Sequence, residues 1–159
     1  MTINDNKKWP LYHKYNHHSY TKSHDRRKEV VLKEPREARE YRLYNNSSKE
    51  LVVYRIDKGV INDDDILKCD YGIYTEDNEL YLVELKGSDY NHAINQLSST
   101  INILLIQPQI TVGRLHTRVV LSKKHTPDIL TTPEMKLRKL LKRFKGDFDK
   151  KSQVFEENV

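Results

Sequence analysis

The fold of this chain is decided by the stretch Cys69-Asp-Tyr-Gly-Ile-Tyr-Thr-Glu-Asp-Asn-Glu-Leu-Tyr-Leu-Val-Glu-Leu-Lys86. Its two halves are rich in aromatic and aliphatic residues, which favour strands, and the polar residues 75–78 between them are typical of a turn. From Leu80 onward the second half is apolar at successive positions, as in a central strand that is buried on both faces. The stretch therefore predicts a β-hairpin.

Charged residues stand at one end of this hairpin. Glu84 and Lys86 are two positions apart, so they point to the same face of the strand, and Asp70 begins the partner strand. If Asp70 lies opposite Glu84, the turn holds three residues. A two-residue turn would shift the register by one and send Asp70 to the other face. Buried charges need a partner or an ion, so this end is the first candidate for a functional site.

Strand and helix signals continue on both sides of the hairpin. Residues 51–56 and 115–121 predict further strands, and residues 34–44 fit either a helix with Pro35 at its first position or, over 41–44, a strand. A helix capped by Ser88 or Asp89 is predicted between the hairpin and the later strand, and it ends at Pro108. Its apolar positions follow helical spacing; they are Ala93, Ile94, Leu97, Ile101, Leu104 and Leu105.

A last helix is predicted with Thr132 as its cap and Pro133 at its first position. Its apolar stripe is formed by four residues, Leu137, Leu140, Leu141 and Phe144. A hairpin followed by a strand–helix–strand crossover predicts an α/β fold, with a mixed central sheet and helices on both of its faces.

Composition limits the chain to one compact domain. It has 159 residues, of which 36% are hydrophobic and 32% are charged. We expect residues 1–30 to be a basic, aromatic arm, residues 31–150 to be the α/β domain, and residues 151–159 to be a tail. The single cysteine, Cys69, excludes an intrachain disulfide, and the chain begins without the apolar run of a signal peptide. Since no apolar stretch could span a bilayer, we expect a cytoplasmic protein.

The charge of +5 is concentrated in two segments. Residues 1–28 hold seven Lys or Arg residues and residues 133–145 hold six. Basic flanks suit a polyanion such as nucleic acid, although two solvated basic segments would have the same composition. The face of the last helix formed by Lys136, Lys139, Lys142 and Arg143 is a candidate phosphate-contacting surface.

Two adjacent carboxylates repel each other unless a cation lies between them. A hard divalent ion such as Mg²⁺ meets that need, and it can hold a phosphate and help to generate hydroxide. In such a site, Lys86 would orient or activate the attacking water and balance the charge that develops on phosphorus. A structural ion pair at a strand end is the alternative interpretation of Asp70, Glu84 and Lys86.

The segments Lys68-Cys-Asp-Tyr-Gly72, Val83-Glu-Leu-Lys-Gly-Ser-Asp89 and Ala93-Ile-Asn-Gln-Leu97 resemble the PD-(D/E)XK, or restriction-endonuclease-like, nuclease superfamily. The resemblance covers roughly a third of the chain. It implies that Asp70 and Glu84, with the Leu85 carbonyl, bind Mg²⁺ or Mn²⁺, and that metal-bound water is the nucleophile. It implies a catalytic role for Lys86, and Gln96 resembles a polar helix residue that steadies the site or the water.

The resemblance has two departures. Cys69 stands where the family has a proline, and the family's N-terminal glutamate could be Glu37 or Glu40, between which the sequence does not choose. A nuclease is the expected function, with DNA favoured over RNA as the substrate, and a homodimer would let a single-site domain cut both strands. The alternatives are a catalytically inactive nucleic-acid-binding module on the same fold, or a protein-interaction adaptor in a defence or mobile-element system.

Weaker candidates come from other parts of the chain. His13, His17 and His18 could suggest zinc, but solvated side chains are the commoner outcome without cysteines at matching spacing. Asp63-Asp64-Asp65 fits an exposed acidic loop better than a cation site. Cys69 is expected to be a small core residue rather than a nucleophile.

Overall fold

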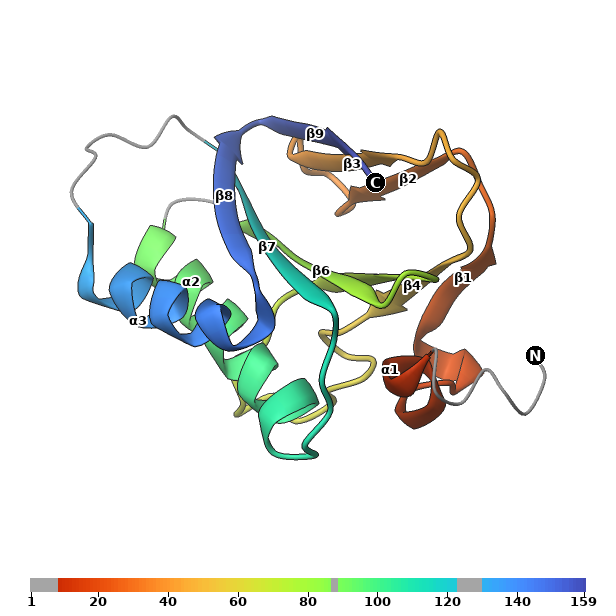
Figure 1. Ribbon diagram of the computed structural model, residues 1–159. Coiled ribbons are helices and arrows are strands. Elements are labelled where there is room, and N and C mark those ends of the chain that lie inside the picture. The colour runs from red at the N-terminus through yellow and green to blue at the C-terminus, as the bar shows by residue number, and fades with distance from the viewer. Residues whose placement is uncertain (1–8, 87–88, 123–129) are drawn as a thin grey trace.

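The computed structural model describes residues 9–86, 89–122 and 130–159, and it contains a six-stranded mixed sheet at its centre (Figure 1). The first four strands in spatial order run antiparallel to their neighbours, and the last three are parallel to one another. The spatial order is β1 (Thr21–Asp25), β4 (Leu51–Arg55), β5 (Tyr71–Thr75), β6 (Glu79–Lys86), β7 (Arg114–Leu121) and β8 (Asp147–Ser152).

The β5–β6 hairpin has the register that brings Asp70 to Glu84. Tyr71 pairs with Val83 and Tyr74 pairs with Leu80, so the turn is the three-residue turn that the sequence allowed. Asn78 closes this turn with a φ of 61°, a left-handed conformation that asparagine tolerates better than most residues. The register expected for a site at the hairpin end is therefore confirmed.

Helix α2 (Tyr90–Ile101) makes the crossover from β6 to the parallel strand β7, and it continues as a π-helical turn, η3 (Asn102–Ile106). Asp89 caps it, because its side chain accepts a hydrogen bond from the His92 amide. All six apolar positions predicted for this helix are buried, which confirms the predicted stripe.

Helix α3 (Thr132–Leu141) and the short η4 (Lys142–Phe144) pack beside α2. Leu137, Leu141 and Phe144 of the predicted stripe are buried. The predicted cap is wrong by one position: the side chain of Thr131, not Thr132, accepts the hydrogen bond from the Glu134 amide. Both residues are threonines, so the sequence pattern alone could not separate them.

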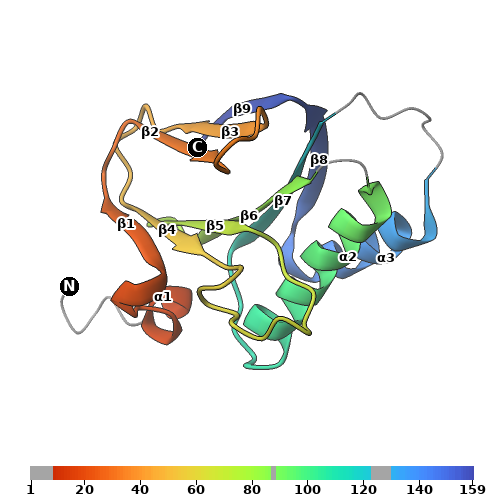
Figure 2. The same ribbon diagram turned by 180° about the vertical axis from the view of Figure 1, so that it is seen from behind.

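In the described part of the chain, the helices lie on one face of the central sheet, and a second sheet covers the other face (Figures 1 and 2). This small sheet contains β2 (Glu29–Lys33), β3 (Glu40–Tyr44) and β9 (Val154–Asn158). The expectation of helices on both faces is therefore wrong in that respect. The helix predicted over 34–44 is absent, and the strand alternative for 41–44 is confirmed.

Both ends of the described chain are part of the packed structure. Residues 151–159, expected to be a tail, supply the end of β8 and the whole of β9, where Phe155 is 1% exposed. Trp9 and Leu11, from the expected arm, are buried with α1 (Pro10–Lys14), and η2 (His18–Tyr20) leads into β1. Residues 1–8 of that arm lie outside the described residues. In the described part of the chain, no helix has the length and apolar character needed to cross a membrane.

Candidate active site

Asp70 and Glu84 meet on the helix-covered face of the sheet, at the end of β6. The main-chain amide of Leu85 donates a 2.9 Å hydrogen bond to Oδ2 of Asp70, and the Glu84 carboxyl group is close enough to act on the pKa of Asp70. Glu84 is only 2% exposed. It points to the helix side because it lies two positions after Leu82, which belongs to the core beneath α2. The structure thus brings the two predicted carboxylates together.

Burial determines the acidity of this pair. It raises the pKa of Asp70 to about 6, and the negative charges of Glu34 and Asp57 act in the same direction. The hydrogen bond from the Leu85 amide and the interaction with the Glu84 carboxyl oppose this effect, because both favour the charged form of Asp70. A carboxyl group with a raised pKa beside a second carboxyl is the arrangement that a bound cation would stabilise.

Two side chains of α2 hold the main chain just before Asp70. Gln96 donates through Nε2 to the carbonyl of Lys68 at 3.0 Å, and Thr100 accepts from the amide of Cys69 at 2.9 Å. The Thr100 hydroxyl also donates to the Gln96 carbonyl. The helix therefore fixes the approach of the chain to Asp70, and this is the contact that the structure shows for Gln96.

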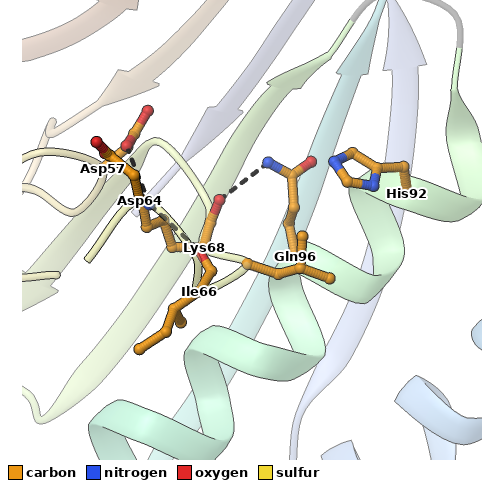
Figure 3. Close-up of a pocket in the computed structure, with 7 residues that line it drawn as sticks. Asp57, Asp64, Ile66, Lys68, His92 and Gln96 are labelled. Carbon is orange, nitrogen blue, oxygen red and sulfur yellow. Dashed lines mark hydrogen bonds and ion pairs between the residues drawn. The ribbon is translucent and has the colours of Figure 1, made fainter. Parts of the chain in front are cut away.

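We call Gln96 and Thr100, with the two hydrogen bonds that hold the chain before Asp70, the clamp. An open pocket of about 180 Å³ lies beside it (Figure 3). Gln96 and His92 enter it from successive turns of α2, and Asp57 and Asp64 line it from the loop before Asp70. Among the described residues, Oε1 of Gln96 is buried without a hydrogen-bond partner, although the Gln96 side chain lines the pocket. Sequence reasoning did not identify this pocket, because His92 and Asp57 carry no recognisable spacing.

Lys86 is the last residue of β6 and pairs with Leu121, so its main chain lies at the same end of the sheet as Glu84. The structure describes its backbone position but not the placement of its side chain. Gly87 and Ser88, which follow it, lie outside the described residues.

Glu34, rather than Glu37 or Glu40, is the N-terminal acid whose charge acts on Asp70. It accepts a 2.8 Å hydrogen bond from the hydroxyl of Tyr71, the residue next to Asp70. Glu37 forms an ion pair with Arg39, and Glu40 forms one with Arg42 in the small sheet. Residues 34–44 form no helix, so neither Glu37 nor Glu40 lies on the N-terminal helix that the family pattern would require, and a role of either in the site remains a prediction.

The donor set at this site is chemically suited to a hard cation, since it offers two carboxylates and the nearby carbonyl of Leu85. It is nevertheless small. Across residues 9–86, 89–122 and 130–159, no group of three or more His, Cys, Asp or Glu side chains is arranged to hold a metal ion. A metal at this site would therefore keep several of its positions for water or substrate, as Mg²⁺ commonly does.

Apart from Asp64, which lines the pocket, the weaker candidates occupy ordinary structural places. His17 stacks on His18 at the surface, with the rings 4.5 Å apart. Asp63 accepts from the Asp65 amide within its own loop. Cys69 is fully buried, and burial raises the pKa of its thiol well above the ordinary value, which agrees with an inert core residue.

The basic face of α3 forms a surface separate from the carboxylates. Lys136, Lys139 and Arg143 line a shallow hollow of about 340 Å³ around Leu140.

Comparison of the chain with protein-family models, with curated proteins and with solved structures finds no match in any of the three. What this site can do must therefore be inferred from its own chemistry.

Proposed function

We propose that this protein is a metal-dependent nuclease with a restriction-endonuclease-like core, and that it hydrolyses phosphodiester bonds in nucleic acid. DNA is favoured over RNA as the substrate. One observation carries the proposal: the β5–β6 register and the hydrogen bond from the Leu85 amide to Oδ2 of Asp70 place Asp70 opposite the buried Glu84 at the end of a central strand, on the face that α2 covers. The order β4, β5, β6, α2, β7, with an antiparallel meander followed by a parallel crossover strand, supports it.

Asp70, Glu84 and the Leu85 carbonyl are the groups that would hold Mg²⁺ or Mn²⁺. When bound, such an ion supplies Lewis-acid stabilisation of a phosphate and lowers the pKa of a water molecule. The protein contributes orientation: the Leu85 amide fixes one oxygen of Asp70, and the clamp from α2 fixes the chain before it. We assign to Lys86 the stabilisation of charge that develops on phosphorus.

A nucleic-acid-binding module without catalysis is the second candidate. The observation that favours it is the small donor set, because two carboxylates bind a divalent ion more weakly than three. This candidate predicts binding to nucleic acid without cleavage and without a metal requirement.

The deciding experiment uses a panel of linear duplex, single-stranded and branched DNA, and RNA, with Mg²⁺, Mn²⁺ or chelator. Wild type is compared with Glu84→Gln and Lys86→Ala, and Glu37→Gln is the control because that residue is ion-paired elsewhere. Cleavage that needs metal, survives in Glu37→Gln and is lost in the other two variants supports the nuclease. A folded wild type that binds the panel but cuts nothing supports the second candidate.

A further inference from the structure

Four residues form one row across the central sheet. Glu84 pairs with Val119, and Val119 pairs with Lys150 on β8. The register of the hairpin continues this row to Asp70 on the other side. Side chains that lie directly opposite one another share a face. Val119 belongs to the core beneath the helices, so Lys150 points to the same face as the two carboxylates.

Tyr90 holds the ammonium group of Lys150 in place. Nζ of Lys150 donates to the Tyr90 hydroxyl at 3.2 Å and lies 4.5 Å from the centre of its ring. The Tyr90 hydroxyl itself donates to Oε1 of Glu134 at 2.7 Å, which fixes its orientation. Tyr90 is the first residue of α2, so this lysine is tied to the beginning of the helix that follows the site.

The ammonium group of Lys150 has hydrogen-bond donors left with which it could bind an anion. Within the described residues, its ammonium group makes no ion pair with a carboxylate. An ammonium group has three donors, and the Tyr90 oxygen takes one of them. Lys150 is half-buried, so the remaining donors stay in reach of a ligand on the surface.

We propose that Lys150 binds a backbone phosphate of the nucleic acid beside the one that is cut. Two strand spacings separate Glu84 from Lys150, about 10 Å. This distance is larger than the rise of about 3.4 Å per nucleotide, so the two residues would contact different phosphates, and Lys150 would reach one that neighbours the scissile phosphate. The inference rests on the proposed function for the location of the scissile phosphate, but it also predicts how the protein binds nucleic acid before any cleavage.

Lys151 is a matched control on the same strand. It is the next residue, with the same charge, but it points to the opposite face. Its Nζ lies 4.5 Å from the centre of the Phe155 ring and 3.5 Å from the Glu156 carbonyl, on the side of the small sheet. A non-specific effect of removing one positive charge would be the same at both positions.

The first test measures the salt dependence of binding to a duplex and to a single strand, in chelator so that nothing is cut. Each lost phosphate contact lowers the slope of log K against log salt by about 1. We expect this loss for Lys150→Ala, together with several-fold weaker binding, and neither effect for Lys151→Ala or Lys150→Arg. Equal slopes for Lys150→Ala and Lys151→Ala, or a wild type that binds neither substrate, would overturn the inference.

The second test uses a substrate with one neutral methylphosphonate linkage, moved step by step away from the cut site. Neutralising the phosphate that Lys150 contacts should abolish the difference in affinity between wild type and Lys150→Ala at that position only. A difference that survives at every position would refute the contact. If wild type binds with the expected slopes but never cuts, the nuclease proposal fails and the first test alone decides the role of Lys150.

Discussion

The main-chain amide of Leu85 donates to Oδ2 of Asp70, so the strand that carries Glu84 also orients the carboxylate opposite it. The pairing of β5 with β6 therefore also sets the relative position of the two carboxylates. A one-residue slip would remove the hydrogen bond and turn Asp70 to the far face. The register of β5 and β6 therefore determines the geometry of the candidate site as well as that of the sheet.

Asp70→Asn should make the protein more stable at neutral pH. Asparagine can still accept from the Leu85 amide and donate to Glu84, while the charge that burial disfavours is gone. The pKa of Asp70 rises from 3.8 to about 6 on folding, so the folded wild type loses stability as pH rises through this interval. The gain for Asp70→Asn should be on the order of 3 kcal/mol at pH 7 and vanish below pH of about 4.

Urea unfolding of wild type and Asp70→Asn from pH 3.5 to pH 8 measures this difference. Addition of Mg²⁺ at pH 7.5 should raise the stability of wild type and leave Asp70→Asn unchanged, since a ligand stabilises the state that binds it. A difference in stability that is constant with pH would mean that Asp70 titrates normally.

Thr100→Val should destabilise the fold, because it leaves the buried amide of Cys69 without its acceptor. The expected cost is about 1–3 kcal/mol in the free energy of unfolding. Thr100→Ser keeps the hydroxyl and should recover most of it. The sharper readout is hydrogen exchange of the Cys69 amide, which should be faster in Thr100→Val than in Thr100→Ser. Equal exchange rates would show that the clamp does not hold this segment.

Glu34→Gln should weaken Mg²⁺ binding, whereas Glu37→Gln should not. The charge of Glu34 acts on Asp70, while Glu37 is paired with Arg39. Calorimetric titration at pH 7.5 gives the dissociation constants directly, and we expect a several-fold increase for Glu34→Gln. Identical constants for both variants and wild type would exclude Glu34 from the electrostatics of the site.

Phe155→Ala should destabilise the protein by about 3–5 kcal/mol, since it removes an aromatic ring from the core between the two sheets. Val154→Ala is the control, because Val154 lies next to it in β9 and is 44% exposed. Thermal unfolding followed by circular dichroism compares the two. Similar melting temperatures for both variants would mean that β9 contributes little to the fold.

The central part of the structure follows from local patterns in the sequence. The hairpin, the capped helix with its six buried apolar positions, and the strand after it are each specified by residues close together in the chain. For the same reason, the meeting of Asp70 with Glu84 could be predicted, since it needs only a strand period and a turn length. Their roles in metal binding and catalysis remain predictions.

The small sheet could not be predicted, because its strands come from distant parts of the chain. β9 is a short, charged segment whose only core residue is Phe155. This pattern is typical of an exposed tail, and only the pairing with β3 shows that the segment is a strand. Arg118 is a second feature that could not be predicted, because a charge is unexpected in a central strand. Its guanidinium group forms ion pairs with the carboxylates of Glu157 and Asp147, at 2.7 and 2.6 Å. Lys150 and Tyr90 become partners only through the packing of β8 against α2.

The pairing of β3 with β9 also has a consequence for the order of folding. Tyr41 and Glu157, which are hydrogen-bonded, are 116 positions apart, so closing this contact costs more chain entropy than closing the β5–β6 hairpin. Contacts between such distant segments slow folding. We expect the hairpin and α2 to be structured in the folding transition state and the small sheet to form afterwards. Mutations in β9 should then change the rate of unfolding far more than the rate of folding.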